Sequence, residues 1–202
     1  YALAALKGVG AAAMRALVQE REERGPFKSL ADFANRVDPR AVNKRTLESL
    51  AAAGAFDALA PNRRQVFDAA ETIVRHAAAS AESRNSNQAS LFGGDQQAAP
   101  RLALPQAVDW SPLEKLQHEF DAVGFYLSAH PLDGYQQSLR RLGVVKLADL
   151  AGLSRLDPGR RKVAAIILGK QERTAKSGNR FAFIQFSDQS GAAEAIVFAE
   201  VL

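Results

Sequence analysis

The sequence predicts a mostly α-helical protein that ends in a partial antiparallel β-sheet. Two observations predict this fold class. Apolar side chains recur at helical spacing in short runs that glycine and proline turns separate, over residues 1–78 and again over residues 110–158. After Gly159 the apolar period shortens to that of strands with two different faces. We therefore expect a helical domain over 1–78, an extended linker over 79–109, a helical connector over 110–158 and a sheet over 159–202.

The first domain is expected to hold short helices joined by tight turns. Start and stop residues give the expected bounds: Ser29 and Asn43 are N-cap residues, and Gly25-Pro26 and Gly54 end helices. The expected helices cover residues 11–24, 30–37, 44–53 and 62–78.

The linker has no helical period, and Pro100 and Pro105 prevent a long helix there. Helical spacing returns from Trp110 to Val123, where Gly124 ends it. Further short helices are expected over 132–142 and 146–150. Three strands follow, over 163–171, 180–187 and 192–198, which form a meander that lacks the remaining strands of a closed sheet.

Composition sets limits on the class of protein. The 202 residues are 47% apolar and 24% charged, as in ordinary soluble domains, and the net charge of +4 slightly favours an anionic partner. Because there is no cysteine, disulfides and cysteine-ligated metal sites are excluded, which fits a cytoplasmic protein. No apolar run is long enough to span a membrane, and no signal peptide is seen. The chain begins within a pattern and stops within a strand, so we interpret it as a piece of a larger protein.

A glycine turn, Leu6 to Gly10, leads directly into the first helix. Glycines let a phosphate approach the backbone, and the amides of Gly8, Val9 and Gly10 would point at it from the N-terminus of a helix. Lys7 and Arg15 would add positive charge. Alternatively, this is a plain turn before a helix.

A second glycine turn, Ala53 to Asp57, lies between two later helices. Two helix–hairpin–helix units would present two backbone turns to adjacent phosphates, with Lys44 and Arg45 nearby. Such contacts hold double-stranded DNA without reading its sequence, and we include Gly54 among the DNA-binding residues.

Several stretches resemble one known family along nearly the whole chain. YALAALKGVG, GPFKSLADFANRVD and VNKRTLESLAAAGAFDAL resemble the tandem helix–hairpin–helix region of the bacterial replicative DNA polymerase III alpha subunits. WSPLEKLQHEFDAVGFYLSAHPLD resembles the segment that follows, and VAAIILGKQERTAKSGNRFAFIQFSDQSGAAEAIVF resembles the opening of the family's OB-fold domain. The resemblance implies a role in DNA replication, together with other replicase subunits, in the bacterial cytoplasm.

The resemblance also implies a binding site for the sliding clamp, the beta subunit. In the family, a pentapeptide of the type Gln-x-x-Leu-Phe lies between the hairpins and the OB-fold domain. Here that position holds Gln88, Ser90, Leu91 and Phe92. An apolar tip of Leu91 and Phe92 suits a pocket, and the Gln88 amide both donates and accepts hydrogen bonds. Alternatively, Leu91 and Phe92 anchor the linker on their own domain.

The strands carry a third candidate site. Basic residues at the expected turn, with Phe181 and Phe183 beside them, suit single-stranded DNA held by charge and stacking. The basic residues in question are Lys170, Arg173, Lys176 and Arg180. Alternatively, the two phenylalanines share a face that is simply core.

Nothing in the sequence predicts a catalytic or metal-binding residue. A polymerase needs carboxylates that hold two metal ions, and the chain has no Asp-x-Asp pair; His76, His118 and His130 lack metal-ligand spacing. The resemblance implies that the catalytic palm, with its Mg²⁺, lies outside this chain, so we expect a non-catalytic region that needs no cofactor. The alternative function is a protein-interaction scaffold of an error-prone, damage-tolerance relative.

Overall fold

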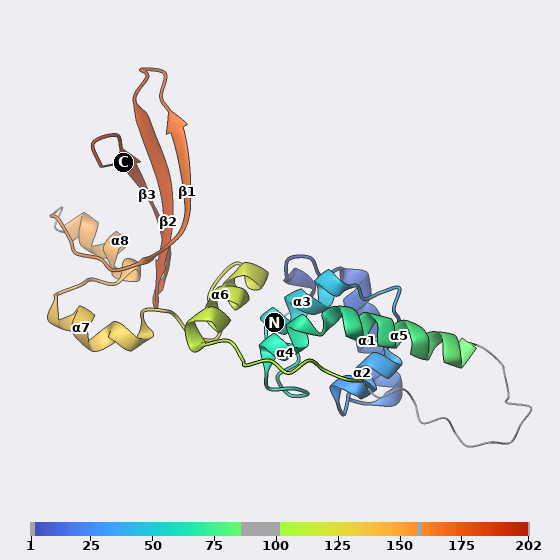
Figure 1. Cartoon of the computed structure of the whole chain (residues 1–202). Coiled ribbons are helices and arrows are strands. Elements are labelled where there is room, and N and C mark those ends of the chain that lie inside the picture. Colours follow the sequence, from blue (N-terminus) through green and yellow to red (C-terminus); the bar gives the residue numbers. More distant parts are fainter. Residues whose placement is uncertain (1–2, 86–101, 157–158, 202) are drawn as a thin grey trace, which may run out of the picture. The chain divides into compact units, whose positions relative to one another are not determined.

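The computed structural model describes residues 3–85, 102–156 and 159–201. The chain divides into two compact units, Tyr1–Leu127 and Ser128–Leu202, which we call the first and the second unit. The connector expected over 110–158 is thus divided between them. Each unit is described by itself (Figure 1).

The first unit is mostly helical over its described residues. Ser29 accepts the Asp32 amide at 3.1 Å and Asn43 accepts the Thr46 amide at 2.9 Å, so both predicted N-caps are confirmed. The last helix has a capping box of Ser111 and Glu114 and ends at Gly124 in the left-handed conformation. The elements are η1 (Leu3–Ala5), α1 (Ala11–Arg24), α2 (Leu30–Arg36), α3 (Lys44–Ala52), α4 (Arg63–Asp68), α5 (Ala70–Asn85) and α6 (Pro112–Val123).

The helix expected over 62–78 is wrong in two respects. It is broken at Ala69 into α4 and α5, and α5 continues to Asn85, so that residues 79–85 of the predicted linker are helical. This stretch, ASAESRN, contains two alanines, a glutamate and an arginine, which favour a helix, and no glycine or proline to break one. Because this stretch has no apolar side chains at helical spacing, periodicity does not predict it as a helix.

The core of the first unit lies between α2, α3 and α5. Leu47, Leu50 and Ile73 are among its most deeply buried side chains. Phe33 packs edge-on against Phe27 and Phe56, with ring centroids 5.2 and 5.1 Å away. Such aromatic contacts stabilise beyond the apolar area that they bury.

Residues 102–109 form an extended strap on α4 rather than a free linker. Asn62 donates to the Ala107 carbonyl at 2.7 Å and Gln65 donates to the Pro105 carbonyl at 2.8 Å. Asp109 accepts the Arg64 amide and pairs with Lys115 at 2.5 Å. The strap continues to Trp110, which stacks on His118 with ring centroids 3.7 Å apart.

The second unit joins short helices to an antiparallel sheet. The strands follow in the order β1-β2-β3, with an irregularity in β1 between Ile167 and Gly169, so the predicted meander is confirmed. α8 is longer than the predicted turn over 146–150. No helix in the described ranges combines the length and apolar character that crossing a bilayer requires. The elements are η2 (Asp133–Tyr135), α7 (Gln136–Arg141), α8 (Leu147–Leu156), β1 (Ile166–Thr174), β2 (Arg180–Asp188) and β3 (Gly191–Phe198).

The turn that carries His130 is fixed to the end of β2. Asp133 accepts the His130 amide at 2.7 Å, and the Leu132 amide donates to His130 Nδ1 at 3.2 Å. Because Nδ1 accepts, the proton of the neutral ring is on Nε2, which donates to Ser187 Oγ at 3.1 Å. The histidine in the stretch SAHPLD is therefore a structural latch.

Candidate nucleic-acid interface

The turn before α1 exposes its backbone. Leu6 and Val9 are buried and hold the turn to the core, whereas Lys7, Gly8 and Gly10 are exposed. Gly8 has a φ of 79°, in the region that glycine adopts without strain, and Gly10 has an extended conformation as the N-cap of α1. The turn thus places exposed backbone at the start of a helix.

The carbonyl groups of this turn are held by α3. Ser49 Oγ donates to the Lys7 carbonyl at 2.8 Å, and Thr46 Oγ1 donates to the Gly8 carbonyl at 3.3 Å. The Lys7 amide donates to the Ala122 carbonyl of α6 at 2.9 Å. The orientation of the turn is therefore set by both flanking helices.

Three amides at the turn remain without an acceptor, but the expectation that the Val9 amide faces a phosphate is wrong, because that amide donates to the Leu6 carbonyl at 3.2 Å. Within the described ranges, the amides of Gly8, Gly10 and Ala11 donate no hydrogen bond, and Gly10 offers no capping side chain. The first turn of α1 also carries no acidic residue. Exposed amides at a helix N-terminus, where the helix dipole is positive, form the arrangement that binds anions.

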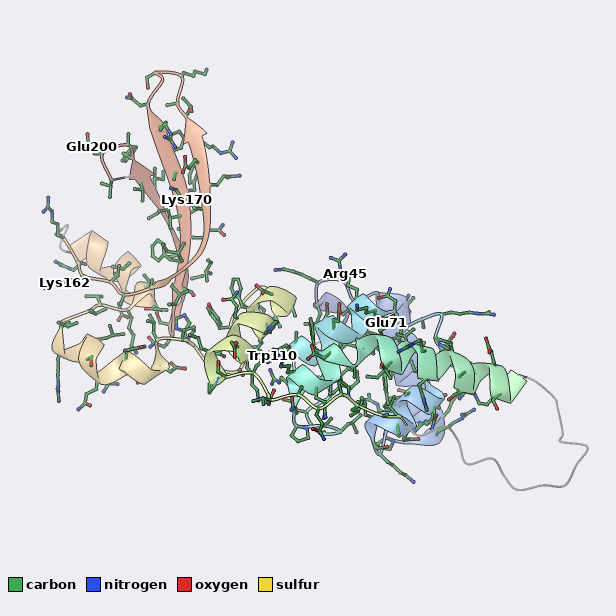
Figure 2. The ribbon with its side chains drawn as sticks, in the orientation of Figure 1. Arg45, Glu71, Trp110, Lys162, Lys170 and Glu200 are labelled. Carbon is green, nitrogen blue, oxygen red and sulfur yellow. The ribbon has the colours of Figure 1, made fainter. Side chains whose placement is uncertain are left out.

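The cationic side chains near the turn differ in their position and in how far acidic neighbours offset their charge. A Cβ atom on Gly8 would lie 3.0 Å from Arg45 Nε, so the Arg45 side chain lies directly over this glycine. Figure 2 shows Arg45 at the edge of the first unit. Lys7 is exposed in the turn, and its Cε atom lies 3.8 Å from where a Cβ atom on Gly124 would be. Lys44, by contrast, pairs with Glu48 at 3.9 Å and Glu71 at 3.7 Å, which offsets its charge.

Arg15 lies further along α1, one turn past the N-terminus. Its side chain is exposed and lines a hollow of about 630 Å³ that is mostly apolar, together with Met14 and Phe27. Arg15 is thus on the same helix as the free amides without belonging to the turn.

The second glycine turn has a different structure. The Gly54 amide donates to the Ala51 carbonyl at 3.0 Å, and the Ala55 amide donates to the Leu50 carbonyl at 2.9 Å. This pair of bonds closes the C-terminus of α3 as a Schellman motif, in which Gly54 has a φ of 77°. The expectation that the Gly54 amide faces a phosphate is therefore wrong, because the helix end uses that amide.

Charged side chains fill the space around Gly54. Arg63 bonds both Asp57 carboxylate oxygens, and its Nη1 lies 3.6 Å from Glu119, whose side chain is only 2% exposed. Hydrogen bonding to Asp57, above all, raises the pKa of Arg63, and both carboxylates add to it. With two acids beside one cation, this turn has no excess positive charge to attract a phosphate.

The basic residues of the sheet fall into two groups. Lys170 pairs with Glu172 at 2.8 Å, and Arg180 pairs with the same carboxylate; these bonds lower the pKa of Glu172. Arg173 instead donates to the side-chain oxygen Oε1 of Gln171 at 3.1 Å, and Lys176 is exposed in the turn between β1 and β2. Among the described residues, only Arg173 and Lys176 of the four form no ion pair.

Phe181 and Phe183 lie on one face of the sheet, with ring centroids 5.6 Å apart, and both are half-buried. The strand register places Arg173 and Phe198 opposite Phe181, and Ile196 opposite Phe183. Because residues paired across antiparallel strands share a face, these side chains form one surface. Phe198 is 65% exposed and Ile196 51% exposed, so much of this face is open.

The candidate clamp-binding residues, Gln88, Ser90, Leu91 and Phe92, lie outside the described residues. Across the described ranges, His, Asp and Glu side chains nowhere gather as a set of three that could ligate a metal ion.

Sequence reasoning missed Thr46 and Ser49, which hold the first turn. Both lie on α3, about 40 residues away in sequence, and hydroxyl groups on a helix carry no signal for such a contact. Ile196 and Phe198 were also missed as neighbours of the phenylalanine pair, because they read as ordinary strand residues.

The chain is similar to known proteins along its whole length. A family model described as a helix-hairpin-helix motif matches residues 1–66. The chain is 40% identical over its whole length to the DNA polymerase III subunit alpha of Caulobacter vibrioides, of which it covers 18%. It is 36% identical to that of Thermus aquaticus, with 98% of the chain and 16% of the relative covered, and 34% identical to that of Pseudomonas fluorescens, with 99% and 18% covered.

Proposed function

Because the chain belongs to the DNA polymerase III alpha subunit family, as a segment of about 18% of its length, we propose that it is a non-catalytic DNA-binding region of a bacterial replicative polymerase. Its first unit holds double-stranded DNA through the turn Leu6–Gly10, without reading sequence. The observation that carries this proposal is the set of free amides at Gly8, Gly10 and Ala11.

The chemistry of the turn fits a phosphate. The free amides donate to phosphate oxygens, while Arg45 at Gly8 and the exposed Lys7 supply positive charge. A DNA backbone carries the same phosphate at every step, so such a contact positions the protein without selecting bases. Arg15 and Lys44 add a more distant field, the latter weakened by its two acidic neighbours.

A salt titration of duplex binding tests this function. Binding by fluorescence anisotropy should weaken steeply with salt, with a slope of about 0.9 on logarithmic axes for each phosphate contacted. The alternative, a protein-interaction scaffold of an error-prone relative, predicts no salt-dependent duplex binding by this chain. A duplex affinity that does not change with salt concentration would therefore favour the scaffold function.

We further propose that Gln88, Ser90, Leu91 and Phe92 bind the sliding clamp. Support comes from the family resemblance and from the composition of the segment, whose one apolar pair suits a pocket. Full burial of both side chains would contribute about 3 to 6 kcal/mol, against backbone ordering of about 1 to 2 kcal/mol for each residue. A modest affinity follows, which tethering to DNA would raise.

The second unit is proposed to be the opening of an OB-fold domain that binds single-stranded DNA. The open face with Phe181, Phe183 and Phe198 favours stacking of bases, and Arg173 lies opposite Phe181 on that face. Lys176 is exposed nearby, whereas the ion pairs of Lys170 and Arg180 weaken their part in the site.

The parent protein is proposed to be a DNA-directed DNA polymerase that acts in the bacterial cytoplasm with other replicase subunits. Its Mg²⁺ and catalytic carboxylates would belong to segments outside this chain. In a primer-extension assay with Mg²⁺ and nucleotides, the chain alone should give no product, and clear extension would contradict its assignment as non-catalytic.

A further inference from the structure

The second unit carries a basic cluster that the sequence splits into two parts. One part lies at the end of α7 and the start of α8, and the other lies in the segment that leads into β1. We call the set the α7–β1 basic patch; it consists of Arg140, Arg141, Lys146, Arg160, Arg161 and Lys162.

A backbone hydrogen bond brings the two parts together. Gly143, with a φ of 67°, turns the chain after α7, and its amide donates to the Arg140 carbonyl at 3.1 Å. Two residues later, the Val145 amide donates to the Lys162 carbonyl at 2.9 Å. The segment before β1 therefore runs beside the turn between α7 and α8 (Figure 1), and Figure 2 labels Lys162 there.

Most of these charges have no acidic partner among the described residues. Within the part of the chain that the structure describes, five of the six form no ion pair and are exposed: Arg140, Arg141, Lys146, Arg160 and Lys162. Arg161 is half-buried and donates to the Arg160 carbonyl at 3.3 Å. Lys170 and Arg180 of the same unit, by contrast, share Glu172.

Local helix electrostatics explain only part of the patch. Arg140 and Arg141 lie in the last turn of α7, where the helix dipole favours cations. Lys146 directly precedes α8, and a cation is disfavoured at that end of a helix. Arg160 and Lys162 lie in an extended segment that has no helix end to stabilise. Local helix electrostatics therefore leave Lys146, Arg160 and Lys162 without a stabilising role, and a cluster of cations attracts anions to the surface that carries it.

We propose that the α7–β1 basic patch binds the phosphodiester backbone of nucleic acid. This goes beyond the proposed function, which places duplex DNA at the first unit and bases on the face of the sheet. Four of the six cations are arginines, whose planar guanidinium forms paired hydrogen bonds to phosphate oxygens. With phosphate as the ligand, binding would be independent of sequence and sensitive to salt.

Charge removal in the whole chain tests the proposal. The variant Arg160→Gln/Arg161→Gln/Lys162→Gln is titrated with salt against two probes, a duplex of about 20 base pairs and an oligothymidine of about 20 nucleotides. The salt slope should fall by about 2 to 3 for whichever probe the patch binds. Arg140→Gln/Arg141→Gln, on the other segment, should lower it for the same probe.

The matched control removes the same charge from the first unit. Arg21→Gln/Arg24→Gln/Arg40→Gln alters three exposed arginines away from the turn Leu6–Gly10 and should leave the slope nearly unchanged. Circular dichroism checks that each variant is folded. A variant at Gly10 tests duplex binding by the first unit, whereas the patch variants test the second unit. The proposed function and the proposal for the α7–β1 basic patch can therefore fail separately.

Two results would overturn the proposal. One is an unchanged salt slope for both probes in both patch variants, provided that they fold. The other comes from a third probe, polyglutamate, which imitates an acidic protein. Patch variants that no longer bind polyglutamate but bind both nucleic acids as tightly as wild type would make the patch a surface for an acidic protein.

Discussion

Ser49 Oγ donates a hydrogen bond of 2.8 Å to the carbonyl oxygen of Lys7, across 42 residues of sequence. With Thr46, which bonds the next carbonyl, this contact directs the carbonyl groups of the turn toward α3. The amides of Gly8 and Gly10 are left free. The shape of the proposed DNA contact thus depends on two hydroxyl groups of a neighbouring helix.

Ser49→Ala should loosen the turn. Loss of one hydrogen bond should lower the free energy of unfolding by about 1 kcal/mol and weaken duplex binding a few-fold, since the turn is less well oriented. Chemical denaturation and anisotropy measure the two effects. Ser177→Ala, at an exposed serine of the second unit, is the control. Equal duplex affinity in Ser49→Ala and wild type would show that the turn needs no support from α3.

The two glycine turns should respond oppositely to substitution. A side chain at Gly54 requires φ near 77° and places Cβ 2.3 Å from Arg63 Nη2, so Gly54→Ala should destabilise by about 1 to 3 kcal/mol. Gly10 has an extended φ of −79° and no other atom near its Cβ position. Gly10→Ser supplies a capping hydroxyl and should keep or raise stability by up to about 1 kcal/mol. Thermal unfolding compares the two; equal losses would contradict the assigned geometry.

These contrasts mark what the sequence can predict. The caps Ser29 and Asn43 were predictable, because each bonds an amide three residues away. The sequence did not predict that the Gly8 amide is free while the Gly54 amide is hydrogen-bonded, although both residues follow the pattern of a glycine turn. Ser49 holds the Lys7 carbonyl of the first turn, and the Arg63 side chain occupies the space beside Gly54 in the second. Neither contact can be predicted from a local sequence pattern.

The same limit applies to the sheet. Strand periodicity predicted the meander and the shared face of Phe181 and Phe183. It could not show that Glu172 takes up the charge of Lys170 and Arg180, since that depends on the strand register. Nor could it bring Lys162 to the turn after α7, because that neighbour is fixed by a backbone bond between distant segments.

The two ion pairs of Arg63 should contribute unequally to the free energy of unfolding. Arg63→Met leaves the buried Glu119 carboxylate without its cation and should cost about 3 kcal/mol. Asp57→Asn removes only the more exposed partner and should cost about 1 kcal/mol or less. Urea unfolding measures both, and Arg63→Met/Glu119→Leu should recover part of the loss. A smaller loss in Arg63→Met than in Asp57→Asn would contradict the burial argument.

The latch at His130 predicts a pH dependence of the second unit. Burial lowers the pKa of His130, although Asp133 and Asp188 oppose the shift. Because the neutral ring is favoured in the folded state, its stabilisation is present above the ordinary pKa of about 6.5 and is lost as pH falls through the lowered folded value. Hydrogen exchange in β2 should therefore show lower protection at pH 5 than at pH 7.5, beyond the intrinsic change in exchange rate.

A glutamine variant isolates this effect. His130→Gln keeps a donor for Ser187 but does not titrate, so its β2 protection should be nearly independent of pH over that range. Asp188 does not interfere: burial tends to raise its pKa, but hydrogen bonds from Ser190, Leu147 and Gly191 outweigh this, so the net pKa is below its ordinary value. The same loss of protection in His130→Gln and wild type would exclude the histidine as its source.

Clamp binding should depend on the segment around Leu91. Leu91→Ala/Phe92→Ala should abolish binding to the sliding clamp, because both apolar groups that would fill its pocket are removed, and should leave duplex affinity unchanged. Surface-binding assays with the clamp and with DNA give both readouts. Ala89→Ser, within the same segment, is the control. Wild-type clamp affinity in the double variant would instead make these residues an anchor of the linker.

The central claim is that free amides at the start of α1 bind a DNA phosphate, and Gly10→Asp tests it most directly. Aspartate is a favourable N-cap residue, so this variant should be at least as stable as wild type, while its carboxylate repels a phosphate at the same place. Duplex affinity at low salt should fall at least about ten-fold, or about 1.4 kcal/mol, relative to Gly10→Ser. A folded Gly10→Asp variant that binds duplex DNA as tightly as Gly10→Ser would contradict the claim.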